Sequence, residues 1–264
     1  MTTSDNELIV EKRGAEGWIT FNNPAKHNAM SYDMWAGIVP ALAAFETDDD
    51  IRVVVLTGAG EKAFVSGANI SQFDKLRSSA DAVAEYERVG EGAQNALYNY
   101  SKPTVARIKG YCLGGGLNLA LCCDVRIACD NSSFSIPAGK MGLGYRMTAI
   151  RNLVTVVGPA NALDIFLSAR RVGAQEGLRM GLIQHLADEA NFEQMVREYL
   201  DRLAGNAPLT LKVGKQMIRR FQEVPSEVDM EEMRELVMTC FASEDYKEGR
   251  KAFAEKRAPV FKGR

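Results

Sequence analysis

Histidine is scarce in this 264-residue chain, and its cysteines never occur at metal-ligand spacing. The two histidines and five cysteines include no CxxC pair, so a zinc site is not expected. The 32 basic and 34 acidic residues give a formal net charge of −2, so there is no basic field for nucleic acid. No apolar run approaches the roughly 20 residues that span a bilayer. The polar start MTTSDNE lacks the features of a signal peptide. We therefore expect a cytoplasmic protein that binds no metal, nucleic acid or membrane.

The remaining composition, 46% hydrophobic and 25% charged, is that of an ordinary globular protein. Short apolar runs near the N-terminus and at 51–57 predict strands. Ser31 is expected to cap a helix that Pro40 kinks or splits. Helical patterns dominate from residue 149, and we expect no strand beyond about Ala187. These patterns predict an α/β core over residues 1–207 and a helical region over 208–264.

A glycine-rich stretch, KPTVARIKGYCLGGGLNLALCCDVRIA at 102–128, is the most informative part of the sequence. A buried strand is expected at 104–108 and a buried helix from Leu117 to Cys123, so Gly114, Gly115 and Gly116 lie between strand and helix. Such glycines either let the two elements pack closely or expose helix N–H groups that can hold an oxyanion. Residues 66–68, SGA, form a second corner of small residues, which taken alone predicts only a turn.

Five segments in order resemble the enoyl-CoA hydratase/isomerase family of the crotonase superfamily. They are NNPAKHNAM, AFVSGANI, the glycine-rich stretch, VGPANALDIFLSARRVGAQEGLRMGLI and AFAEKRAPVFKG. The resemblance implies an α/β spiral of ββα turns and a helical C-terminal region that builds homotrimers, often paired into hexamers. It also implies an acyl-CoA substrate whose thioester enolate is stabilised, with no cofactor beyond the coenzyme A of the substrate.

The same resemblance maps an oxyanion hole onto the backbone N–H groups of Ala68 and Gly115. In hydratases of the family two glutamates hold and activate a water, and here these positions are Asn118 and Ala138. Neither side chain can act as a carboxylate base. Tyr145 is then the leading candidate for a proton donor. Arg146 is a candidate partner for a substrate carboxylate, and Asn118 is a candidate for orienting water or a carboxylate.

Further residues are expected at the coenzyme A part of the site, again from the resemblance. One set lies near the two corners: Lys26, Ala29, Ser66, Ala68 and Ile70. A second set, Phe253, Phe261 and Lys262, matches a region that in many members reaches the coenzyme A of an adjacent subunit.

Three functions remain open on the sequence. The first is the enolate chemistry of the hydratase/isomerase family, carried out without its usual glutamates. The second is decarboxylation of a malonyl-type CoA, which needs no base to begin and only a proton donor to finish. The third is a noncatalytic scaffold that binds acyl-CoA.

Overall fold

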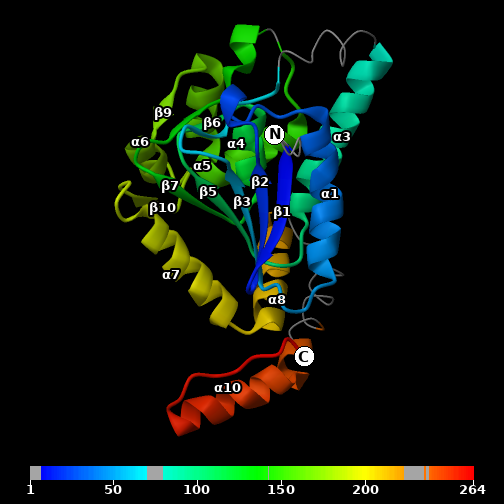
Figure 1. Ribbon diagram of the computed structural model, residues 1–264, viewed down its shortest axis with the longest axis vertical. Coiled ribbons are helices and arrows are strands. Elements are labelled where there is room, and N and C mark those ends of the chain that lie inside the picture. Colours follow the sequence, from blue (N-terminus) through cyan, green and yellow to red (C-terminus); the bar gives the residue numbers. More distant parts are fainter. Residues whose placement is uncertain (1–6, 70–79, 142, 223–234, 236–237) are drawn as a thin grey trace, which may run out of the picture.

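Two sheets form the framework of the computed structural model, which describes residues 7–69, 80–141, 143–222, 235 and 238–264. The strands of the six-stranded sheet are, in spatial order, β1 (Leu8–Arg13), β2 (Glu16–Phe21), β3 (Val53–Gly58), β5 (Thr104–Ile108), β7 (Val125–Cys129) and β10 (His185–Ala187). Those of the four-stranded sheet are β4 (Ala63–Val65), β6 (Tyr111–Leu113), β8 (Ser133–Ser135) and β9 (Val172–Gly173). Figure 1 shows the six-stranded sheet, the longer of the two, between the helices.

The helices follow pairs of strands along the chain. They are η1 (Pro24–Lys26), α1 (Tyr32–Glu46), α3 (Ala80–Tyr98), α4 (Gly115–Cys122), η3 (Pro137–Met141), α5 (Met147–Ser168), α6 (Ala174–Arg179), α7 (Phe192–Gly205), α8 (Pro208–Phe221) and α10 (Glu244–Glu255). The order β3-β4-α3, β5-β6-α4 and β7-β8-α5 repeats one ββα unit, and each repeat adds a parallel strand to both sheets. This confirms the predicted spiral. The trimerisation role of the C-terminal region stays a prediction.

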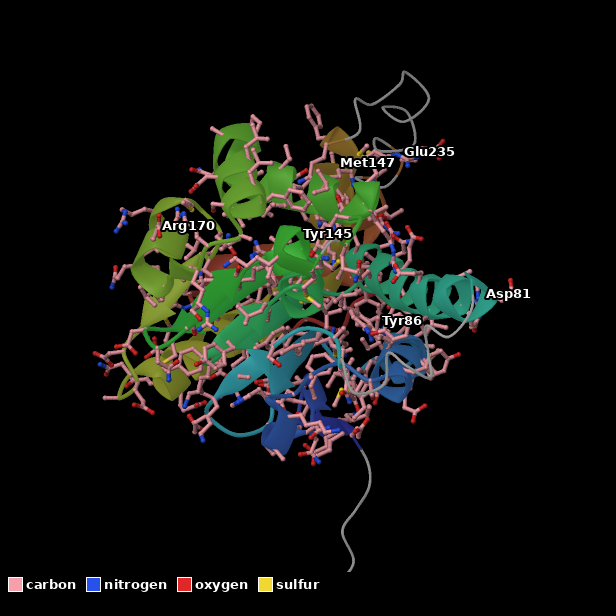
Figure 2. All side chains as sticks on the ribbon, turned by 90° about the horizontal axis from the view of Figure 1, so that it is seen from above. Asp81, Tyr86, Tyr145, Met147, Arg170 and Glu235 are labelled. Carbon is pink, nitrogen blue, oxygen red and sulfur yellow. The ribbon has the colours of Figure 1, made fainter. Side chains whose placement is uncertain are left out.

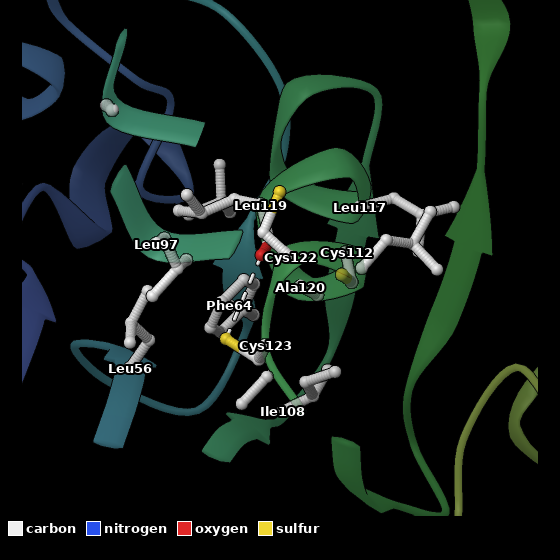
Figure 3. Packing of buried hydrophobic residues seen from close by; sticks show 14 of the residues in the cluster. Leu56, Phe64, Leu97, Ile108, Cys112, Leu117, Leu119, Ala120, Cys122 and Cys123 are labelled. Atoms are coloured by element: carbon white, nitrogen blue, oxygen red, sulfur yellow. Dashed lines mark hydrogen bonds between the residues drawn. The ribbon is translucent and has the colours of Figure 1, made fainter. Parts of the chain in front are cut away.

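Buried β-branched residues explain the centre of the longer sheet. All six residues of β3, VVVLTG, are buried, because β3 lies between β2 and β5 and both faces of the sheet are covered. α4 is buried as well, from Gly116 to its end. Figure 3 shows Leu117 and Leu119 of this helix among apolar side chains from neighbouring strands and helices.

The cysteines behave as expected of reduced core residues. All five are free, and four are buried. Burial raises the pKa of the Cys122 thiol to about 12, and it raises the pKa values of Cys112 and Cys123 further. These thiols therefore stay protonated and unreactive near neutral pH.

Three local expectations were wrong. Ser31 caps α1 as predicted, with its Oγ accepting the Met34 N–H at 3.2 Å, but Pro40 lies within an unbroken helix. Pro40 is on the exposed side, and the buried residues Ile38 and Leu42 hold the helix against the core. The strands β4 and β6 were not expected, because three residues show no clear period.

The third difference concerns membrane-length segments. α5 is long and apolar enough to cross a membrane by length and composition alone, and only a minority of its most apolar stretch is buried. Core helices of soluble proteins meet the same criterion. Gly158, at φ 74°, divides α5 into two helical parts just before Pro159.

A charged cluster joins α8 to the core. Asp124, which directly precedes β7, accepts from Lys215 Nζ at 2.7 Å and from Arg219 Nη2 at 3.0 Å, and so helps to fix α8. Beyond α8, α10 lies at the end of the molecule away from α4 and β6 (Figure 1). The division of the chain at residue 208 stays a prediction.

Candidate active site

The corner at residues 66–68 leaves one backbone donor unused. Met30 and Ala68 form a parallel bridge, in which Met30 N donates to Gly67 O at 2.8 Å and Asn69 N donates to Met30 O at 2.9 Å. The bridge thus uses the residues on either side of Ala68, so the Ala68 N–H faces away from Met30. Within the described chain this N–H donates to no other group.

Three glycines form the second corner, and each has a different structural role. Gly114 has φ 52° and ψ −118°, which an L side chain rarely adopts, and its N–H donates to Ser135 O at 2.8 Å. Gly116 packs so closely that a Cβ would lie 2.4 Å from Val65 O. Gly115 is the first residue of α4, so its N–H has no partner within the helix, and no described group outside the helix accepts it.

The two corners adjoin because their strands do. β4 and β6 are parallel neighbours, with Ala63 opposite Tyr111, so both strands end at the same edge of the sheet. A Cβ on Gly114 would lie 3.9 Å from the Gly67 Cα. The free N–H groups of Ala68 and Gly115 therefore belong to two touching segments that are separated by some 45 residues of sequence.

Asn118 and Tyr145 lie side by side near this edge. Asn118 is on the first turns of α4 and is 6% exposed. Its Oδ1 and the Tyr145 hydroxyl are both buried, and neither meets hydrogen-bond geometry with a described group. Burial raises the pKa of Tyr145, and the neighbouring Asn118 side chain lowers it by less. Tyr145 is therefore a neutral phenol over the physiological range, with a hydroxyl that no described protein group occupies.

Ala138, which the resemblance assigns to the second glutamate position, is buried. Ala138 lies in η3 and is 3% exposed. Tyr145 follows it in the same loop, and its ring contacts Phe166 edge-on, with 5.4 Å between the ring centroids. Figure 2 shows Tyr145 among the elements that precede α5. The loop offers the phenol as its ionisable group beside Asn118.

Arg146 is already paired. Its guanidinium forms a two-nitrogen ion pair with Glu87 of α3, in which Nε donates to Oε2 at 2.8 Å. Both side chains are partly exposed. A substrate carboxylate would have to compete with Glu87 for Arg146, which the sequence did not reveal because nothing in chain order links residue 87 to residue 146.

Sequence analysis also missed Trp35 and Tyr86. Trp35 belongs to the buried face of α1, and its Nε1–H donates to the Tyr86 hydroxyl at 3.2 Å. The indole touches the second corner, since Cζ2 would be 3.4 Å from a Cβ on Gly115. Its apolar spacing in the sequence is the same as that of any core residue, so no signal distinguished it.

The residues expected at the coenzyme A fall into two groups. Lys26 is exposed, and its carbonyl accepts the Ser66 hydroxyl at 3.5 Å, which brings η1 to the first corner. Ala29 and Ser66 are partly buried beside it, whereas Ile70 lies outside the described residues. The C-terminal group lies elsewhere in this chain, since the Lys262 N–H donates to Asp245 of α10 at 2.6 Å. Phe253 is in α10, and its side chain is also outside the described part.

A cavity of about 430 Å³ lies apart from these residues, next to the charged cluster of Asp124 and α8. It is lined mainly by α4, α5 and α8 near the beginning of β5 and β7. Neither corner residue lines it, nor does Tyr145. The free N–H groups of Ala68 and Gly115 and the buried hydroxyl of Tyr145 lie away from this cavity. We therefore assign the candidate site to these groups rather than to the cavity.

Comparison with known proteins gives one consistent result. The family model for enoyl-CoA hydratase/isomerase matches residues 12–264. The chain is similar to the short-chain-enoyl-CoA hydratase of Clostridium acetobutylicum, with 31% identity over 252 residues and 96% of each chain covered. It is also similar to the carnitinyl-CoA dehydratase of Escherichia coli K12, with 34% identity, covering 97% of this chain and 98% of that one. A solved enoyl-CoA hydratase/carnithine racemase from Magnetospirillum magneticum aligns with a TM-score of 0.93 and 33% identity, over 99% of this chain and 97% of that one.

Proposed function

The chain belongs to the enoyl-CoA hydratase/isomerase family, and from this premise we propose that it stabilises the enolate of an acyl-CoA thioester. The Ala68 and Gly115 N–H groups would hold the thioester oxygen. The observation that carries the proposal is that these two unpartnered donors sit on touching corners, beside the buried hydroxyl of Tyr145.

Backbone donors suit this task because they are fixed before the substrate arrives. Negative charge grows on the thioester oxygen as the enolate forms, and donors already in place need no reorganisation at that moment. Loss of one such donor costs about 2.7–4 kcal/mol of transition-state stabilisation. Small residues at both positions leave the approach to the N–H groups open.

Tyr145 supplies the proton in this proposal. The usual glutamates are replaced by Asn118 and Ala138, so no carboxylate is available at either place to activate water. Burial raises the pKa of Tyr145 and keeps its proton on the phenol until an enolate carbon accepts it. Asn118, beside the hydroxyl, would orient the phenol or a substrate group.

Decarboxylation of a malonyl-type CoA is the second candidate, and the neutral pair at 118 and 138 favours it. When the C–C bond breaks, carbon dioxide leaves and the electron pair of that bond stays behind in the enolate. Only protonation of the enolate must follow. The Glu87 pair weakens one part of this scheme, because Arg146 is not a free cation for the substrate carboxylate. Asn118 Nδ2 is then the better candidate for holding that group. Two of the relatives are named as a hydratase and a dehydratase, which favours chemistry on a C–O bond instead.

Oligomerisation and coenzyme A binding extend the proposal. A homotrimer or hexamer would bring Phe253 and Lys262 of one chain to the coenzyme A held near Lys26 of another. Within one chain, α10 lies at the end of the molecule away from α4 (Figure 1). No cofactor other than the coenzyme A of the substrate is required by the scheme. A noncatalytic acyl-CoA scaffold remains the contrasting function.

A direct substrate comparison tests the proposal. Purified protein is given crotonyl-CoA, with hydration followed by loss of enoyl absorbance, and methylmalonyl-CoA, with decarboxylation followed by release of carbon dioxide. We expect turnover of at least one thioester, and loss of that turnover in Tyr145→Phe. Hydration that survives Tyr145→Phe would refute the phenol as proton donor. Tight binding of both thioesters without turnover would support the scaffold.

A further inference from the structure

One turn of α3 touches both halves of the candidate site. Tyr86, 7% exposed, accepts the Trp35 indole N–H, and Trp35 lies against Gly115. The next residue, Glu87, binds Arg146, which follows Tyr145 directly. Figure 2 shows Tyr86 where α3 meets α1. Adjacent residues of one helix are thus connected to the oxyanion donor and to the proton donor.

Trp35 packs against the first turn of α4. It is 4% exposed, and its Cζ2 would be in ordinary van der Waals contact, at 3.4 Å, with a Cβ on Gly115. The next residue, Gly116, has no room for a Cβ beside Val65 of β4. The first turn of α4, which carries the Gly115 N–H, therefore has the indole and β4 as neighbours.

Gly90, one turn along α3 from Tyr86 and Glu87, lies near both partners. A Cβ there would be 3.8 Å from Arg146 Nη2 and 3.9 Å from the Trp35 ring. The indole and the guanidinium thus rest on the same short stretch of α3. A shift of this stretch would therefore act on both halves of the site.

We propose that Tyr86 and Glu87 are positioning residues that set the distance between the oxyanion donor and the proton donor. Tyr86 acts through Trp35 on the Gly115 N–H. Glu87 acts through Arg146 on Tyr145. Neither touches the reacting atoms. The inference rests on the proposed function, so its test needs a readout of the oxyanion hole that does not depend on turnover.

A conjugated aryl-enoyl thioester, 4-aminocinnamoyl-CoA, provides that readout. Its absorption moves to longer wavelength when hydrogen bonds polarise the thioester carbonyl. We expect a red shift on binding to the wild type, and a smaller one in Trp35→Phe and Tyr86→Phe. The matched controls are Trp18→Phe, at the other tryptophan of the chain, and Tyr98→Phe, at the far end of α3. Both controls should keep the full shift.

The second arm concerns Glu87. Glu87→Gln should leave the red shift unchanged but lower kcat by about 10- to 100-fold, as expected for a misplaced catalytic group. Glu85→Gln is its control, since Glu85 binds Arg88 and Tyr32 on the exposed side of α3. A red shift in Trp35→Phe and Tyr86→Phe equal to that of the wild type would overturn the Tyr86 arm. A kcat for Glu87→Gln equal to that of Glu85→Gln would overturn the Glu87 arm.

Failure of the proposed function has a different signature. If the wild type binds the thioester without any red shift, the oxyanion hole itself is refuted, and the positioning roles fall with it. If the wild type shows the shift and both Trp35→Phe and Tyr86→Phe match it, the hole stands and only the Tyr86 arm of the positioning inference fails. Tyr86→Phe removes one hydroxyl and no ring, so it guards against loss of folding in Trp35→Phe.

Discussion

The glycine corner at 114–116 and the loop at 137–146 adjoin the same candidate site but are fixed in opposite ways. In the corner, space is so limited that a Cβ on the last glycine would meet Val65. In the loop, the glycines Gly139 and Gly144 have nothing within 4 Å of an added Cβ. The last glycine of the corner therefore has no room for a side chain, whereas a side chain at either of these loop glycines would meet open space.

This difference separates the main-chain groups of the candidate site, which depend on packing, from its side chains, which substitutions can change. The proposed oxyanion donors are main-chain groups whose place depends on packing, so the chain keeps them when side chains diverge. The groups proposed to move protons are side chains, and the two positions that the resemblance assigns to the hydratase glutamates hold Asn118 and Ala138. Reaction type is thus the part of the function most easily altered in such a site.

The largest effect is expected from the loop. Tyr145→Phe removes the proposed proton donor and should lower kcat by about 10²- to 10⁴-fold. Tyr100→Phe is the matched control, because Tyr100 is another tyrosine with a buried hydroxyl that lacks a hydrogen-bond partner among the described residues. Steady-state kinetics on the thioester that the wild type prefers gives kcat for both variants. Equal kcat values for the two variants would contradict a catalytic role for Tyr145.

Stability against pH should not separate these two variants. Burial raises the pKa of both tyrosines above the ordinary 10.0. As the pH rises, the two tyrosines therefore ionise first in the unfolded chain. The unfolding free energy that they contribute below about pH 10 is then lost above it. Each Phe variant should show a weaker alkaline loss of unfolding free energy than the wild type.

Much of the fold was predictable, since the strands around β3 are apolar runs and the glycines mark the start of α4. The two three-residue strands β4 and β6 were not, because such short segments carry no period. The join between the 66–68 and 114–116 corners came from family resemblance. Sequence patterns give no way to see that residues some 45 positions apart touch.

The candidate site was predictable only in part. The structure places the Ala68 and Gly115 corners side by side and Asn118 beside Tyr145, and the roles of these residues stay predictions. The Glu87 pair of Arg146 was not foreseeable, because an ion pair across two helices depends on how those helices pack. Trp35 was hidden for a related reason, since a core tryptophan and a positioning tryptophan have the same sequence pattern.

A backbone change in the corner should have the next largest effect. Proline is tolerated at the first residue of a helix, so Gly115→Pro removes the N–H while keeping the start of α4. Gly115→Ala adds the same contact with Trp35 but keeps the N–H. We expect kcat of the proline variant to be about 100- to 1,000-fold below that of the alanine variant. Similar kcat values in the two variants would exclude this N–H from the oxyanion hole.

The smallest effect is expected at Gly116, where the neighbouring atoms leave no room for a side chain. Gly116→Ala would place a Cβ 2.4 Å from Val65 O and 2.6 Å from Val65 Cβ, and should cost about 1–3 kcal/mol of unfolding free energy. Gly92→Ala is the matched control, an exposed position within α3 with nothing within 4 Å, where alanine should stabilise by about 0.5–1 kcal/mol. Urea unfolding measures both. Opposite signs for one substitution in two helices would show that close packing, rather than helix propensity, selects glycine here, whereas a stabilised Gly116→Ala would mean that α4 can shift away from β4.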